Sequence, residues 1–275
     1  MSETPGFFPA RDGAPLYGVY HAPSEASRAA VLIAPGLLEE RKSAYAVLAG
    51  LARDLAAAGH PVLRFDFRGS GESGGDVSRR RWAHLAEDLA AAREALLRLS
   101  GRSTAALVGL RLGATLVLQE AARLAPSAVV VLAPVLKGSS EVRLWRVRSK
   151  MRAELTGAVG RPSGSPNAGD PEDRPTNPPG AALDLDGFTV ATGFLDDLAR
   201  LDLTAGSAPL TAPALIVQVS HRETPAPDYE RLVAALGPKA QLACVRLEPF
   251  WDRVDEVDAG GLYESVRRFL AGVSL

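Results

Sequence analysis

An arginine occupies the centre of a motif that usually holds a catalytic nucleophile. The run Gly109-Leu110-Arg111-Leu112-Gly113 has the frame G-x-S-x-G, in which a strand ends in a tight turn and a helix begins. Arg111 stands in the place of the serine. A guanidinium stays protonated and only donates hydrogen bonds, so Arg111 cannot attack a carbonyl carbon. Backbone N–H groups at a helix start already make the potential positive, so Arg111 requires an anion.

Two places in the sequence offer a carboxylate for Arg111. Glu39 and Glu40 follow the first predicted buried strand, and Glu223 follows a later one at the usual place of a triad acid. Adjacent side chains usually point apart, so one of the pair is expected to start the helix near residue 43 while the other turns toward Arg111. An internal ion pair and a bound anionic ligand both satisfy Arg111, and the sequence leaves both open.

The backbone donors that stabilise a developing oxyanion are expected to survive. Beside a nucleophile elbow, two backbone N–H groups together stabilise the oxyanion. One comes from the loop after the first buried strand, which holds Leu37 and Leu38, and the other from the residue after the nucleophile, here Leu112. These three residues are therefore candidate binding positions.

The position of the triad histidine holds no histidine. The loop after the last predicted strand reads Leu-Glu-Pro-Phe-Trp-Asp over residues 247–252 and places Phe250 and Trp251 at the predicted site. Of the four histidines, His221 alone lies near that site, and it is the candidate for a replacement base. Phe250, Trp251 and His221 are predicted to line the pocket.

Regular elements around these residues alternate between strand and helix, which indicates an α/β fold with a mostly parallel central sheet flanked by helices. An antiparallel strand at 16–21 is expected to precede the parallel set. The predicted buried strands cover 29–34, 62–65, 105–109, 128–132, 214–219 and 242–247, and the predicted helices cover 43–58, 82–99, 112–124, 228–236 and 261–270.

A second motif supports the same fold. Residues 66–73 match the strand and loop pattern D-x-R-G-x-G-x-S, in which the glycines permit backbone angles closed to other residues. We expect Asp66 and Arg68 to tie this turn together by hydrogen bonds. The two motifs at this separation predict an α/β-hydrolase fold.

The alternation breaks between residues 137 and 212. Six of the twenty prolines fall between Pro162 and Pro179, so a mobile loop is predicted at 157–182. We expect 137–212 to form a cap over the site, inserted between two parts of one core domain, 1–136 and 213–275.

The composition narrows the kinds of partner that the protein is expected to bind. With 31 Lys and Arg against 32 Asp and Glu, the formal charge of -1 carries no basic excess for nucleic acid. Cys244 is the single cysteine, no apolar run approaches the ~18 residues of a membrane span, and the N-terminus is acidic where a signal peptide would be basic. We expect a cytoplasmic protein with no metal or cofactor and with a small-molecule ligand, for which the chemistry of Arg111 allows an anion. A protein partner stays open.

These motifs resemble the exosortase A system-associated hydrolase 2 family of the α/β-hydrolase superfamily. The shared features are Pro35 with the Glu39-Glu40 pair, the 66–73 motif, the 109–114 elbow, Pro134-Val135 with Gly138, residues 186–188 and Phe250-Trp251. The resemblance covers nearly the whole chain and implies an association with bacterial exopolysaccharide and protein-sorting systems.

Three functions are compatible with these residues. The first is a noncanonical hydrolase or pseudo-hydrolase whose pocket binds a carboxylate or phosphate through Arg111. The second is an active hydrolase or acyl-transfer enzyme on an ester, thioester or amide, in which Glu39, Glu40 or Glu223 activates water. The third is an interaction protein that presents the basic stretch 143–150 to an acidic partner or a membrane surface.

Overall fold

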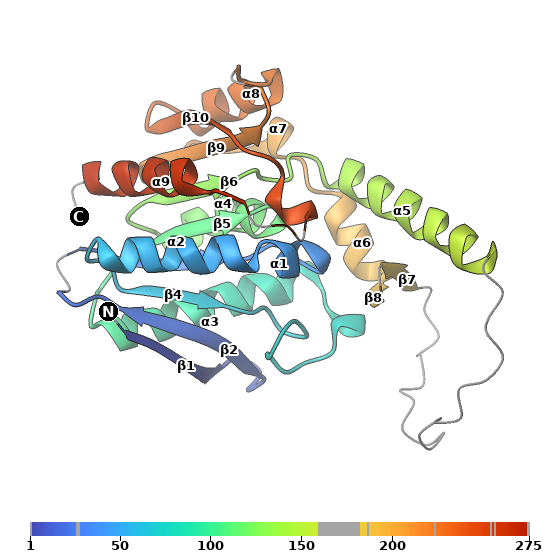
Figure 1. Cartoon of the computed structure of the whole chain (residues 1–275), viewed down its shortest axis with the longest axis horizontal. Helices are drawn as coiled ribbons and strands as arrows, with labels where there is room; N and C mark the ends of the chain where they lie inside the picture. The colour runs from blue at the N-terminus through green and yellow to red at the C-terminus, as the bar shows by residue number, and fades with distance from the viewer. Residues whose placement is uncertain are drawn as a thin grey trace.

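The computed structural model describes residues 2–25, 28–158, 182–185, 187–222, 224–253, 255 and 257–273. These residues form an eight-stranded sheet with the order β1-β2-β4-β3-β5-β6-β9-β10 (Figure 1). Strands β1 and β2 are antiparallel to each other, β2 is antiparallel to β4, and the remaining neighbours in this sheet, β4, β3, β5, β6, β9 and β10, are parallel. The α/β fold with a mostly parallel sheet is therefore confirmed.

Apart from β1, the strands agree closely with the apolar runs of the sequence. The large sheet contains β1 (Ser2–Pro9), β2 (Pro15–Ala22), β3 (Ala30–Ala34), β4 (Val62–Phe65), β5 (Ala105–Leu110), β6 (Val129–Leu132), β9 (Ala214–Ser220) and β10 (Ala240–Arg246).

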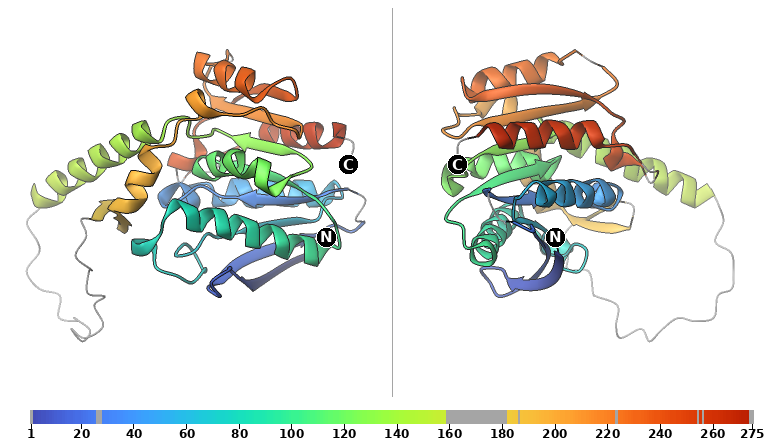
Figure 2. Two further views of the ribbon diagram at one scale, coloured as in Figure 1. Left: turned by 180° about the vertical axis from the view of Figure 1, so that it is seen from behind. Right: turned by 60° about the vertical axis from the view of Figure 1, so that its left-hand side comes forward.

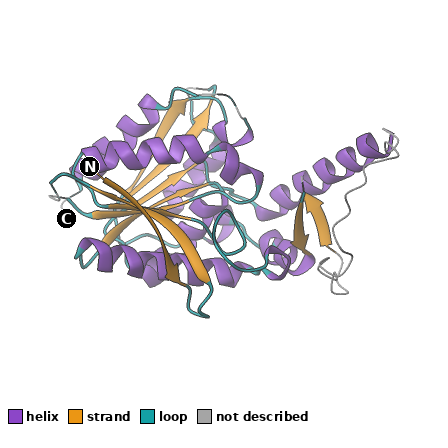
Figure 3. Cartoon of the chain, turned by 60° about the horizontal axis from the view of Figure 1, so that its bottom comes forward, coloured by secondary structure: helices purple, strands orange, loops and turns teal. Residues whose placement is uncertain are grey.

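Helices cover both faces of this sheet (Figure 3). Alternate residues of β3 enter opposite cores: Val31 packs with α2 and α9, whereas Leu32 packs with α3, α4 and α8. The helices of the two layers and of the first loop are α1 (Glu39–Ser43), α2 (Tyr45–Ala57), α3 (Trp82–Ser100), α4 (Leu112–Leu124), α8 (Pro227–Leu236) and α9 (Gly260–Gly272), with short 3₁₀ turns η1 (Val77–Arg79) and η3 (Phe250–Asp252).

The turn between β5 and α4 keeps the backbone of a nucleophile elbow. Arg111 has φ 54° and ψ -118°, a conformation that costs free energy for any residue with a side chain. The flanking glycines let the turn close, because a Cβ on Gly109 would lie 2.6 Å from the Cα of Ala114 and one on Gly113 would collide with the carbonyl oxygen of Pro35. The elbow is therefore intact around an arginine.

The 66–73 motif ties the sheet edge to neighbouring helices as well as to its own turn. Asp66 accepts two hydrogen bonds from Arg41 of α1, at 2.8 and 2.6 Å, and Ser73 donates to the Asp66 carbonyl oxygen. Arg68 forms a buried, bidentate ion pair with Asp88 of α3. These contacts fix the loops beside the elbow.

Residues 137–212, which we call the cap segment, contain a long helix and a small hairpin. The elements are α5 (Gly138–Ala158), β7 (Ala182–Leu185), β8 (Phe188–Ala191), α6 (Thr192–Ala199) and α7 (Leu203–Gly206). Figures 1 and 2 show α5 leading away from the large sheet, with α6 and the hairpin beside it. Most of the predicted loop 157–182 lies outside the described residues.

Three details differ from the expectations. Strand β1 was not predicted, because its residues are exposed and lack the apolar alternation that marks a buried strand. The helix expected at 43–58 is α2, and a separate short helix that was not predicted, α1, precedes it from Glu39. Strand β10 is half-buried because it forms the edge of the sheet.

No helix in the described part of the chain is long and apolar enough to cross a membrane.

Candidate functional site

Arg111 lies at the carboxyl edge of the parallel strands, where the loops after β3, β5, β6 and β10 meet. Its side chain is 16% exposed. Within the described residues its guanidinium contacts a carboxylate from each of two helices, a backbone carbonyl and an indole ring. The arginine predicted to require an anion therefore has two internal ones.

The first of these is Glu40. Arg111 Nε donates a hydrogen bond to Glu40 Oε1 at 2.9 Å, and the Glu40 side chain is 9% exposed. The chain reaches this position through Leu38, which has φ 56° and ψ -129° and directly precedes α1. Gly36 leaves the space that Glu40 needs, because a Cβ there would lie 3.3 Å from Glu40 Oε2. The inward-pointing member of the predicted Glu39-Glu40 pair is thus Glu40.

The second carboxylate is Glu141, which was not predicted as a site residue. Arg111 Nη2 donates a hydrogen bond to Glu141 Oε2 at 3.1 Å, and Glu141 lies in the first turn of α5. The four charged residues that follow it in 143–150 are all basic, and this stretch was a candidate interaction surface. A signal was available, because α5 follows β6, whose carboxyl end is adjacent to that of β5 in a parallel sheet.

An aromatic ring occupies the loop where a triad histidine would be expected. The Arg111 guanidinium lies over the Trp251 ring at 5.1 Å from its centroid, within the range of a cation–π contact. Phe250 packs edge-on against Trp251, with centroids 5.2 Å apart. The loop after β10 therefore supplies a stacking surface to Arg111.

Burial and neighbouring charges set the protonation states of Glu40 and Arg111. Burial raises the pKa of the Glu40 carboxyl to about 7; Arg111 opposes this rise, and the negative charges of Glu141 and Asp252 add to it. Burial alone would lower the pKa of the Arg111 guanidinium, but Glu40 and Glu141 raise it above its ordinary value. Arg111 is consequently a permanent cation, whereas Glu40 changes charge near neutral pH.

The other predicted site residues are placed as follows. Glu39 is 47% exposed and pairs with Lys42, so it is the member of the glutamate pair that points away from Arg111 at the start of α1. His221 is exposed in the loop after β9, and Glu223 lies outside the described residues. Leu37, Leu38 and Leu112 are buried, and Leu112 is the first residue of α4.

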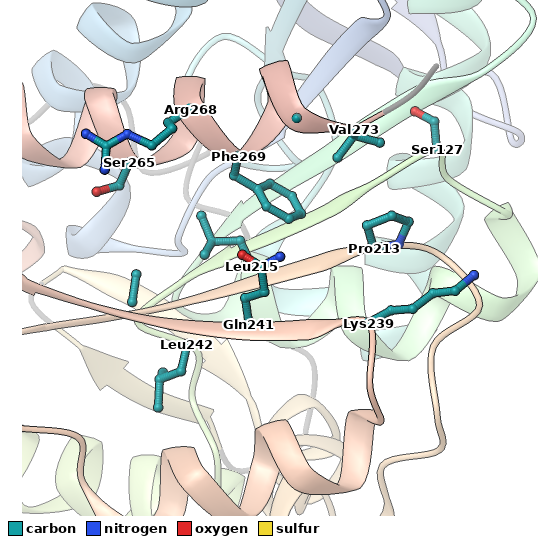
Figure 4. Close-up of a pocket in the computed structure, with 12 residues that line it drawn as sticks. Ser127, Pro213, Leu215, Lys239, Gln241, Leu242, Ser265, Arg268, Phe269 and Val273 are labelled. Atoms are coloured by element: carbon teal, nitrogen blue, oxygen red, sulfur yellow. The ribbon is translucent and has the colours of Figure 1, made fainter.

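A separate cavity of about 710 Å³ lies between β10 and α9 (Figure 4). Its lining includes Ser127, Pro213 and Lys239, which precede β6, β9 and β10, so it opens at the amino ends of these strands. It is distinct from the Arg111 site, which lies at their carboxyl ends. No cluster of residues suited to a metal ion occurs in the described ranges.

The sheet order, the strained turn after β5 and the loops gathered at its end define an α/β-hydrolase fold. Residues 25–168 match the family described as serine aminopeptidase, S33, and the chain belongs to this hydrolase family. No curated protein matches the sequence.

Solved structures of the same fold align over nearly the whole chain. Est1E from Butyrivibrio proteoclasticus, solved with ferulic acid bound, is 17% identical with a TM-score of 0.68 and 98% of each chain covered. GrgF from Penicillium sp. sh18, an alpha/beta hydrolase, is 15% identical with a TM-score of 0.66 and 99% of each chain covered. XC6422 from Xanthomonas campestris, a serine hydrolase without lid, is 17% identical with a TM-score of 0.58, covering 98% of this chain and 94% of that one.

Proposed function

We propose that this protein is a pseudo-hydrolase, which keeps the α/β-hydrolase scaffold but binds its ligand without forming an acyl-enzyme. The observation that carries the proposal is Arg111 itself: it holds the strained backbone of the nucleophile position and is anchored there by Glu40 and Glu141. A protonated guanidinium offers no lone pair for attack on a carbonyl. The site supports recognition better than acyl transfer.

The ligand we propose is a small carboxylate or phosphate. A guanidinium has five N–H groups, and three hydrogen bonds to described residues leave two for a ligand. When Glu40 is protonated, the charges of Arg111 and Glu141 cancel, so an anion meets less repulsion than when both glutamates are ionised. Binding should therefore be tighter at acidic pH, with the cap segment placing Glu141 beside the ligand.

The test is thermal stabilisation of the full chain by butyrate and by inorganic phosphate at two pH values on either side of 7. A ligand that binds only the folded state raises the melting temperature with concentration. We expect a larger rise below pH 7 for the wild type and none for Arg111→Met. Glu40→Gln keeps the arginine and should bind at both pH values. Equal shifts in wild type and Arg111→Met would exclude Arg111 as the binding group, and Arg231→Met, at a 62% exposed arginine, is the matched control.

The absence of a covalent step has its own test. We expect a fluorophosphonate probe to leave the protein unlabelled, because residue 111 is not a serine. Arg111→Ser should also gain no esterase activity, since the loop after β10 presents Trp251 where a histidine would activate that serine. Stoichiometric labelling of wild type at a serine near residue 111 would disprove the proposal.

A second function is favoured by one observation, the pKa of Glu40 near 7. A carboxylate with such a pKa is well matched to act as a general base on water, with Arg111 polarising an ester, thioester or amide. We rank it second because Glu40 Oε1 already accepts from Arg111 and Oε2 is buried from solvent, with no hydrogen-bond partner in the described structure. Turnover that is lost in Glu40→Gln but kept in Glu39→Gln would reverse this order.

We also propose that the chain is a cytoplasmic member of the exosortase A system-associated hydrolase 2 branch. Three motifs of that resemblance, the Glu39-Glu40 pair, the elbow and Phe250-Trp251, converge on Arg111. The expected phenotype of a strain without the protein is a loss of exopolysaccharide export or protein sorting, restored by wild type and not by Arg111→Met. Normal export and sorting in that strain would reject the assignment.

A further inference from the structure

Helix α5 carries apolar residues on two different faces. Val142 and Trp145 are 4% and 5% exposed and pack into the core on the side facing α6 and β7. Leu144, Val147 and Met151 are instead 42%, 49% and 59% exposed. Their spacing of three and four residues places them in one row along the helix, which we call the apolar stripe. The packing of the fold gives no reason for this second row.

A row of cations runs alongside the apolar stripe. Arg143, Arg146 and Lys150 are exposed, and each directly precedes a residue of the stripe. One residue turns an α-helix by about 100°, so this cationic row follows one edge of the stripe along the helix axis. Arg148 lies on the other edge, where it approaches Asp252 at 3.5 Å. Among the exposed side chains of α5 that the structure describes, Glu154 is the one acid.

The setting of α5 leaves this face accessible. Figures 1 and 2 show the helix extending beyond the body of the sheet, and its inward contacts are made through the opposite face, by Val142 and Trp145. An apolar row edged by cations on an extended helix is the pattern of helices that lie in the plane of a membrane interface, where the apolar side chains enter the acyl boundary and the cations meet anionic headgroups.

We propose that the apolar stripe and the cationic row of α5 dock this protein on an anionic membrane surface. An acidic protein would satisfy the cations but leave three exposed apolar side chains unexplained, whereas a bilayer interface uses both rows at once. Lipid headgroups also require no fixed spacing between cations. The docking is peripheral and reversible, because one short stripe buries little apolar area.

Sedimentation of the full chain with lipid vesicles tests the proposal. We expect wild type to sediment with vesicles of phosphatidylcholine and phosphatidylserine, to sediment much less with phosphatidylcholine alone, and to be released by high salt. Absence of wild-type protein from the anionic vesicle pellet at low salt would overturn the proposal.

Two sets of substitutions test the apolar stripe and the cationic row separately. Each set alters exposed side chains, so the fold should persist, which circular dichroism checks. We expect each set to weaken partitioning onto anionic vesicles at least about tenfold, whereas a control set that removes three exposed arginines elsewhere should change it by less than about threefold. The stripe set is Leu144→Ser, Val147→Ser and Met151→Ser; the cation set is Arg143→Gln, Arg146→Gln and Lys150→Gln; the control set is Arg79→Gln, Arg231→Gln and Arg268→Gln, whose side chains are 77%, 62% and 76% exposed.

An environment-sensitive dye reports whether the stripe enters the lipid. The dye is attached at Val147→Cys in a Cys244→Ser background, and its emission should shift to the blue on anionic vesicles. The same dye at Phe7→Cys, a 63% exposed position on β1, should not shift. Binding that survives the stripe set, with no shift at residue 147, would overturn membrane insertion and leave a purely electrostatic contact of the kind that an acidic protein makes.

Discussion

Arg111 Nε and Glu40 Oε1 lie 2.9 Å apart, so the residue in the nucleophile position is hydrogen-bonded to α1, the first helix after β3. The pair joins the turn after β5 to the start of α1. Glu141 closes the arrangement from the cap segment at 3.1 Å. The elbow has thereby become the anchor of a buried charge cluster.

Removing the arginine should destabilise the protein. Arg111→Met leaves Glu40 and Glu141 buried without a cation, which should cost about 3 kcal/mol of unfolding free energy in urea denaturation. Adding Glu40→Gln should recover roughly 1 kcal/mol, because the second change removes one of the stranded charges. If the two changes are strictly additive, the pair is not energetically coupled.

The pH dependence of stability should report Glu40. Its pKa is raised from 4.5 to about 7 by burial, so the folded state binds this proton more tightly than the unfolded chain does. The resulting stabilisation is fully present below about pH 4.5 and is lost as pH rises through about 7. Between these limits wild type should lose roughly 2 to 3 kcal/mol relative to Glu40→Gln.

The neighbouring Glu39→Gln, which alters a 47% exposed side chain, is the control for that measurement and should keep the wild-type slope. Chemical denaturation at a series of pH values gives the curves. Parallel curves for wild type and Glu40→Gln would show that Glu40 does not titrate in this range.

The close approach of α4 to the first loop should make Gly113 intolerant of substitution. A Cβ there would collide with the carbonyl oxygen of Pro35 and lie 2.7 Å from that of Ala34. Gly113→Ala should therefore cost at least about 2 kcal/mol. Gly261→Ala in α9, where a Cβ meets nothing within 4 Å, should be neutral or stabilise by up to about 1 kcal/mol. Similar melting temperatures for the two variants would contradict the packing.

The buried pair of Arg68 and Asp88 should matter far more than an exposed pair. Asp88→Ala removes the bidentate partner of the Arg68 guanidinium, which is 7% exposed and keeps the more exposed Asp12 at 2.8 Å, so it should cost about 2 to 3 kcal/mol. Glu264→Ala breaks the exposed pair with Arg268 and should change stability by less than about 0.5 kcal/mol. Calorimetric melting of both variants provides the comparison, and equal losses would contradict it.

Most of the fold follows from local patterns. The apolar runs predicted β4 and β9 within a residue of their ends, and the three- and four-residue spacing predicted α3 and α4 equally well. The burial of a strand or of one helix face produces a periodic pattern of apolar residues in its own sequence. Strand β1 was not predicted because an exposed edge strand carries no such pattern.

The sequence by itself determined that residue 111 cannot be a nucleophile, that no histidine follows the last strand and that an elbow surrounds the arginine. Only the tertiary structure decided which carboxylates neutralise it. Glu40 was chosen over Glu39 by the direction in which α1 begins, and Glu141 arrives from a helix whose local sequence is basic. The physical reason is that charge pairing acts through space, so partners from separate loops leave no periodicity or spacing in the chain that could reveal them.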